Sequence, residues 1–135
     1  MESVEKSIVV DAAVESAYQL WTNFENFPKF MKSLHEVRRI DEKRYYFKSE
    51  REGREHEIIA EMSLQIPQRR VAWRTISGEE SSGVVSFEPD PDGRTKICFK
   101  MLYDAHGGWS DPVALSERLQ SNLENFKRLM ETGEC

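Results

Sequence analysis

The sequence has little cysteine and no long hydrophobic run. Cys98 and Cys135 are the only cysteines among 135 residues and lie far apart, so neither a disulfide framework nor a CxxC site is expected. No apolar stretch approaches the roughly 20 residues that span a bilayer, and MESVEKSIVV at the start has no basic segment before its apolar residues. We therefore expect a soluble, cytoplasmic protein with free thiols and no integral membrane segment.

An excess of positive charge is also absent. Lys and Arg total 19 against 24 Asp and Glu, for a formal net charge of -5, which argues against a nucleic acid or an anionic membrane as the main partner. The basic pairs at 38–39, 43–44 and 69–70 stand near acidic residues such as Asp41 and Glu42. A solvated sheet edge is therefore favoured over RNA binding.

Motifs for metal, hydrolase and nucleotide chemistry are missing. His35-Glu36 and His56-Glu57 are similar to the start of a zinc hydrolase motif, but Arg39 and Ala60 stand four positions after the histidines. The second imidazole ligand is thus lacking. There is no GxSxG, and the glycines match neither a phosphate loop nor a dinucleotide turn. We expect no metal site and no cofactor.

The apolar residues that are present first follow a strand and then a helix. Residues 3–10, SVEKSIVV, are typical of a strand, and Asp11 is placed to cap the helix that follows. Asn26 with Pro28 can start a second short helix, because proline fits a first helical turn. The first helix is indicated by one apolar face at i, i+3, i+4 and i+7, which consists of Val14, Ala17, Tyr18 and Trp21.

From Ser33 onward the apolar period changes to two, which is the period of a strand. Residues 34–40 and 43–49 predict a hairpin, and 54–66 alternate with His56, Ile58 and the later even positions facing inward. Three more strands follow, in which the inward residues are Val71, Trp73 and Thr75, then Gly83, Val85 and Phe87, then Thr95, Ile97, Phe99, Met101 and Tyr103. The count reaches seven antiparallel strands.

The last segment returns to a helical period. Ser110 or Asp111 with Pro112 marks a helix start. An apolar stripe then runs to the end through Leu115, Leu119, Leu123, Phe126 and Met130. We predict one α+β domain over residues 1–135, in which a curved seven-stranded antiparallel sheet surrounds a long C-terminal helix and two short helices follow the first strand.

Four segments of the chain follow a known family pattern in order. They are SIVVDAAVESAYQLWTNFENFPKFM, EMSLQIPQRRVAWR, GVVSFEPDPDGRTKICFKM and LENFKRLME. Together they resemble the polyketide cyclase/dehydrase branch of the START-like superfamily, near its small coenzyme Q-binding-protein-like members. The resemblance covers nearly the whole chain and implies a helix-grip fold, in which the sheet grips the long helix and the two short helices close one end of an apolar cavity.

The resemblance gives the aromatic stretch WTNFENFPKFM (21–31) a place in that fold. It implies that Trp21 faces the sheet while the later apolar residues line the floor or gate of the cavity; the alternative is that they only complete the core. The ligand-binding residues expected on this basis are Phe27, Phe30, Met31, Phe47, His56, Ile58, Met62, Trp73, Phe87, Phe99, Tyr103, Leu119 and Leu123.

The functional expectation is binding or transport of a hydrophobic small molecule, such as a quinone, a lipid or a polyketide-like aromatic, by a monomer or weak homodimer. No catalytic residue is assigned. The alternative is a polyketide aromatase/cyclase or dehydratase using the same cavity, in which His56, Tyr103 or Arg54 moves protons. His56 can equally be a solvated histidine at the rim.

Two outward-facing features suggest other roles. Ala72, Arg74 and Ile76 lie on the outer face of a predicted strand and can form a protein interaction surface. Cys98 lies between Lys96 and Lys100, where the lysines favour a lowered thiol pKa. No inward base pairs with this thiol, so we expect no catalytic role for it.

Overall fold

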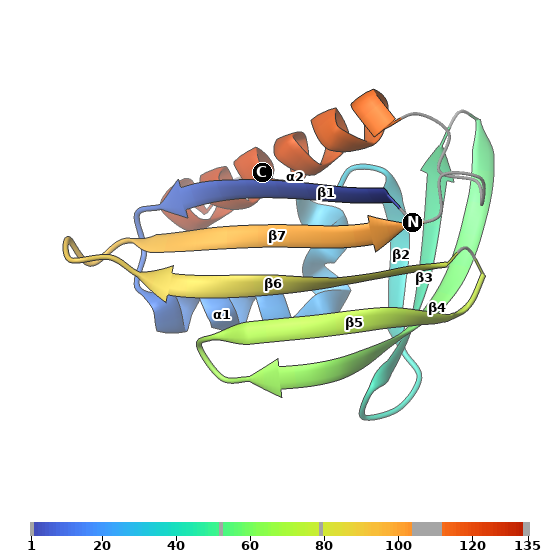
Figure 1. Ribbon diagram of the computed structural model, residues 1–135, viewed down its shortest axis with the longest axis horizontal. Coiled ribbons are helices and arrows are strands. Elements are labelled where there is room, and N and C mark those ends of the chain that lie inside the picture. The colour runs from blue at the N-terminus through green and yellow to red at the C-terminus, as the bar shows by residue number, and fades with distance from the viewer. Residues whose placement is uncertain (1, 52, 79, 104–111, 134–135) are drawn as a thin grey trace.

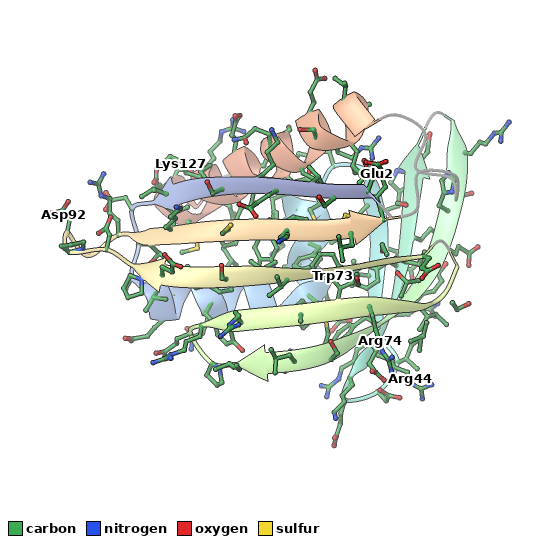
Figure 2. The ribbon with its side chains drawn as sticks, in the orientation of Figure 1. Glu2, Arg44, Trp73, Arg74, Asp92 and Lys127 are labelled. Carbon is green, nitrogen blue, oxygen red and sulfur yellow. The ribbon has the colours of Figure 1, made fainter. Side chains whose placement is uncertain are left out.

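The chain folds into one curved, seven-stranded antiparallel sheet with helices packed on it, the α+β helix-grip arrangement predicted from the sequence. A computed structural model describes residues 2–51, 53–78, 80–103 and 112–133 (Figure 1). The strands are β1 (Glu2–Val10), β2 (Leu34–Arg39), β3 (Arg44–Arg51), β4 (Arg54–Ile66), β5 (Arg70–Ser77), β6 (Ser81–Pro89) and β7 (Thr95–Tyr103). The helices are α1 (Val14–Thr22), the 3₁₀ helix η1 (Phe24–Lys29) and α2 (Pro112–Thr132).

The strand order explains how the sheet encloses a space. The order is β1-β7-β6-β5-β4-β3-β2, so every neighbouring pair except β1 with β7 is consecutive in sequence. In Figure 1, β1, β7, β6 and β5 run across the view, β2 and β3 stand upright on the right, and β4 curves from one part into the other. Helices α1 and η1 connect the two edge strands β1 and β2. They therefore cross the concave side of the sheet, where α2 also packs.

The start of α1 differs from the sequence prediction. Ala13, not Asp11, is the N-cap residue, and no side chain caps the helix. The Asp11 backbone N–H instead donates a 2.7 Å hydrogen bond to Oε2 of Glu131, which joins the end of β1 to α2. The predicted cap is wrong because the chain turns for two residues between the strand and the helix.

The second short helix also begins earlier than predicted. It is a 3₁₀ helix that starts at Phe24, with Pro28 inside it rather than at its first turn. The N–H of Asn26 donates to the carbonyl of Asn23 at 2.9 Å, and the N–H of Phe30 donates to that of Phe27 at 3.1 Å. Proline is tolerated because this short ladder needs no N–H at its position.

Strand β4 has the predicted bounds, but its inward alternation stops early. Met62 pairs with Trp73, whereas Leu64 pairs with Ala72, so the register shifts between the two β4 residues. A bulge of this kind adds one residue to a strand and turns the following side chains to the other face. Leu64 is 40% exposed as a result, and its predicted inward position is wrong.

The core lies between the concave sheet face, the α1–η1 segment and α2. The predicted stripe of α2 is buried from Leu115 to Phe126, while Met130 is half-buried. Phe30 and Phe126 are fully buried with ring centroids 5.1 Å apart. Asn125 of α2 donates a 3.1 Å hydrogen bond from Nδ2 to the Phe30 carbonyl. The cap formed by α1 and η1 is thus fastened to α2 by both packing and a buried hydrogen bond.

Candidate functional site

An apolar chamber of about 160 Å³ lies between the sheet and the α1–η1 cap. Cavities of about 150 Å³ with similar apolar walls stay dry and bind benzene. The chamber walls come from the cap, from Met31 after it and from strands β2 to β7. They consist of Trp21, Phe24, Phe27, Met31, Leu34, Phe47, Ile58, Ala60, Met62, Val71, Trp73, Ser81, Val85, Phe99 and Met101.

Edge-to-face aromatic contacts hold the cap against the chamber. The Trp21 ring lies 5.5 Å from Phe27 and 5.1 Å from Phe126, measured between centroids. Phe24 lies 5.0 Å from Tyr45 of β3 at an interplanar angle of 76°. Burial raises the pKa of the Tyr45 hydroxyl, which keeps it neutral. The aromatic stretch 21–31 therefore serves both as core and as a chamber wall.

One hydroxyl pair is the polar feature of the apolar chamber. Ser81, a wall residue only 4% exposed, lies 2.9 Å from Thr75 between the side-chain oxygens. Each hydroxyl can donate one hydrogen bond and accept two. Since only one proton is used between them, the pair can offer an O–H to a carbonyl or hydroxyl oxygen of a bound molecule.

A second chamber of about 130 Å³ adjoins the first and reaches α2. Leu34, Phe47, Ile58 and Met101 line both chambers, and this shared wall is called the neck. The remaining walls of the second chamber are Ser33, Ser49, His56, Leu115, Arg118, Leu119 and Asn122. The second chamber thus adds polar groups and a cation to a site whose first part is almost wholly apolar.

The predicted ligand-binding residues divide into three groups. The first chamber is lined by Phe27, Met31, Phe47, Ile58, Met62, Trp73 and Phe99, and the second by His56 and Leu119 together with Phe47 and Ile58. Neither chamber is lined by Phe30, Phe87, Tyr103 or Leu123, which are buried in the core. Inward parity predicts that a side chain lies on the concave side of the sheet. It does not predict whether that side chain packs in the core or lines a chamber.

The three candidates for proton transfer also differ in whether they line a chamber. Tyr103 is 2% exposed and Arg54 is exposed on β4, and neither lines a chamber. His56 is half-buried and lines the second chamber. Of the three residues considered for acid–base chemistry, only His56 is placed where a ligand in these chambers can reach it.

Sequence reasoning missed several wall residues. Ala60, Val71, Val85 and Met101 share the inward parity of their strands, so the signal was present. Arg118 and Asn122 lie beside the apolar stripe of α2 and are spaced by one helical turn. Nothing in the sequence separates that pair from an ordinary solvent-facing one, and only the packing of α2 identifies them.

Outward-facing charges and the Cys98 thiol are placed away from both chambers. Arg38 pairs with Glu36 at 3.0 Å, and hydrogen bonds from Arg44 lower the pKa of Asp41 to about 2. Burial raises the pKa of Cys98, so the lowered pKa considered for this thiol is wrong. The desolvation of the half-buried sulfur outweighs the two neighbouring lysines.

Metal clusters and membrane-crossing helices are not found among the described residues. No group of three or more His, Cys, Asp and Glu is close enough to hold a metal ion in that part of the chain. Neither does any helix in it combine the length and apolarity needed to cross a bilayer.

Gly83 leaves room for the ring of Trp73, which lines the first chamber. The two residues are cross-strand partners, and a Cβ at position 83 would collide with the Trp73 ring and lie 2.6 Å from the Lys100 carbonyl oxygen. Gly83→Ala is expected to displace the ring and lower the free energy of unfolding by about 1–3 kcal/mol. Urea unfolding and tryptophan emission measure both effects, with Ser82→Ala as control. Unchanged stability and emission would contradict this packing.

Comparisons with known proteins agree with this geometry. The family described as polyketide cyclase/dehydrase and lipid transport matches residues 1–131. An uncharacterized 17.2 kDa protein of Streptomyces lincolnensis is 34% identical over 97% of this chain and 91% of its own length. A START superfamily protein from Mycobacterium smegmatis has a TM-score of 0.73 at 14% identity, over 96% of this chain and 94% of that one. The di-domain ARO/CYC StfQ of the steffimycin biosynthetic pathway has a TM-score of 0.79 at 12% identity, over 96% of this chain and 45% of that one.

Proposed function

The chain belongs to the polyketide cyclase/dehydrase and lipid transport family, and from that premise we propose that it binds and carries a hydrophobic small molecule in its apolar chamber. Suitable classes are a quinone, a lipid or a polyketide-like aromatic. The observation that carries the proposal is a chamber of about 160 Å³ whose walls, as far as the structure describes them, are apolar except for Ser81. Small-molecule sites are typically concave and apolar with a few placed polar groups.

The chemistry of the walls favours a carrier over an enzyme. General acid–base catalysis needs a titratable group within hydrogen-bond reach of the reacting atom. Among the described residues, the first chamber has no titratable wall residue, and the second has His56 and Arg118. The proposal is therefore binding without chemistry in the first chamber.

Polyketide processing is the second candidate, and it rests on His56. This imidazole lies on the wall of the second chamber, next to the neck, where it can exchange a proton with the polar end of a bound poly-ketone. A carrier keeps its affinity within a few-fold in His56→Ala. An enzyme using this base loses turnover by about 100-fold or more.

A titration with 4-phenylbutyramide tests the proposed binding. This neutral probe has one aromatic ring for the first chamber and a short chain for the neck. We expect one saturable site by isothermal titration calorimetry, with submillimolar affinity and a change in tryptophan emission, because Trp21 and Trp73 line the chamber. A lack of saturable binding up to the solubility limit of the amide would overturn the proposal.

A further inference from the structure

Thr75 and Ser81 face each other where the β5–β6 hairpin closes. The backbone register of the two strands continues as far as Arg74 with Ser82. The next residues, Thr75 on β5 and Ser81 on β6, therefore stand opposite each other, and their side-chain oxygens are 2.9 Å apart. Ser81 lines the first chamber, as does Ala60, the partner of Thr75 on β4. The two hydroxyls thus lie on the concave face of the sheet, with Ser81 in the chamber wall.

The hydroxyl pair has more protons than hydrogen bonds among the described residues. Two hydroxyls carry two protons, and the bond between them uses one. No further hydrogen bond of either side chain is found in the part of the chain that the structure describes. Ser81 is 4% exposed, whereas Thr75 is half-buried. When Thr75 donates to Ser81, the remaining proton belongs to the buried hydroxyl, where a donor without an acceptor costs free energy.

The wall around Ser81 determines which kind of acceptor suits that proton. As far as the structure describes this wall, its other side chains are apolar. A carboxylate or phosphate would lose its hydration there and meet no cation among these residues, which makes its burial costly. A carbonyl oxygen is uncharged and accepts the available proton, whereas a hydrocarbon leaves that proton unpaired. Trp73 and Phe99 of the same wall, with ring centroids 5.2 Å apart, add flat surface for an aromatic ring.

We propose that the bound molecule carries a neutral carbonyl group, whose oxygen accepts a hydrogen bond from Oγ of Ser81 in the first chamber. The inference rests on the proposed function and narrows the ligand class to an aromatic ketone or a quinone, rather than a lipid with a hydrocarbon tail. Thr75 donates its proton to Ser81 in the complex, which leaves the Ser81 proton for the ligand. An aromatic ring fits the chamber of about 160 Å³, since cavities of about 150 Å³ bind benzene.

The test uses two flat probes of nearly the same shape, with calorimetric titration of each. Acetophenone has a carbonyl oxygen where α-methylstyrene has a methylene group, and the two share the ring and the methyl group. Ser81→Ala is expected to weaken the affinity for acetophenone about 10-fold, because the buried carbonyl loses its donor. The affinity for α-methylstyrene should stay the same or rise, because this hydrocarbon uses no hydrogen bond. Ser82→Ala is the matched control, since Ser82 is the next residue of β6 and lines neither chamber; it should keep both wild-type affinities.

The outcomes separate the carbonyl inference from the proposed function. A hydroxyl pair that only closes the hairpin predicts that Ser81→Ala leaves the acetophenone affinity unchanged, or lowers both affinities equally. Either result would overturn the inference, as would a lack of acetophenone binding to a wild-type protein that still binds 4-phenylbutyramide. Failure of all three probes to bind would overturn the proposed function and the inference with it.

An infrared measurement on the wild-type protein decides the question if Ser81→Ala does not fold. A hydrogen bond lowers the carbonyl stretching frequency of a ketone below its value in a hydrocarbon solvent. We expect this lowering for bound acetophenone, measured with an isotope-labelled carbonyl so that the protein amides do not overlap it. A bound frequency equal to that in the hydrocarbon solvent would overturn the inference.

Discussion

Replacing Ala60 with leucine is expected to weaken the affinity for 4-phenylbutyramide by about 100-fold or more, without lowering the free energy of unfolding. Ala60 is 1% exposed and lines the first chamber, so the added carbons enter the space that a ligand would fill. Close-packed walls cannot move aside without losing contacts of their own. A loss of 100-fold corresponds to about 2.7 kcal/mol of binding free energy.

The stability part of this prediction separates an open chamber from a filled core. Each buried methylene contributes about 0.8 kcal/mol when space is available, so Ala60→Leu should keep or raise the free energy of unfolding. Ala17→Leu is the matched control, because Ala17 is fully buried on α1 and lines neither chamber. Overpacking there should cost about 1–3 kcal/mol. Equal destabilisation of the two variants in urea would mean that Ala60 has no free space beside it.

Trp21→Ala should lower the free energy of unfolding by about 3–5 kcal/mol. Trp21 is 2% exposed, and its ring contacts side chains of the cap, the sheet and α2. The centroid distances are 5.6 Å to Phe30, 6.4 Å to Phe87 and 6.4 Å to Phe99. Removing the indole leaves a cavity where these three layers meet, and neighbouring rings cannot close it.

Trp73→Ala provides the comparison for the Trp21 result. Trp73 is half-buried at the chamber wall, so its removal loses fewer contacts and should cost less than half as much. Chemical unfolding of both variants, with the same denaturant and a far-ultraviolet circular dichroism signal, measures the difference. A cost below about 1 kcal/mol for Trp21→Ala, or a larger cost for Trp73→Ala, would contradict the assigned core.

The fold was largely predictable because its elements follow simple periods. Alternation with period two marked the six strands after Ser33, and the 3.6-residue stripe marked α2. The errors occur where the backbone departs from those periods. The shift that exposes Leu64 depends on pairing with β5, and the early start of η1 at Phe24 depends on local backbone turns. Neither feature is encoded in hydrophobic alternation.

The chambers were only partly predictable, for a different physical reason. Strand parity places a side chain on the concave face, but a chamber exists where facing elements fail to meet. Phe27 and Phe30 belong to the same aromatic stretch, yet Phe27 lines a chamber and Phe30 packs fully against Phe126. Arg118 joins the second chamber through the docking of α2. Whether a side chain lines a chamber depends on how the sheet, the α1–η1 cap and α2 pack together. The hydrophobic pattern of one segment describes only that segment.

The outer sheet face remains a predicted interaction surface. Arg74 pairs there with Glu61 at 3.1 Å, which leaves the arginine engaged within the sheet. Ile76 is 44% exposed and Leu102 is 42% exposed. Because these apolar groups also attract hydrophobic probes, binding of a probe by itself does not identify the chamber. The position of the bound probe has to be measured.

Isotope-edited nuclear Overhauser spectroscopy of the 4-phenylbutyramide complex measures that position directly. The proposed function predicts contacts from the phenyl protons to the methyl groups of Ile58, Met62 and Val85, which line the first chamber. The matched methyl groups on the outer face belong to Leu64, Val84 and Leu102. Contacts to the first set alone would establish an internal site for hydrophobic ligands. Contacts confined to the second set would contradict it and assign binding to the sheet surface.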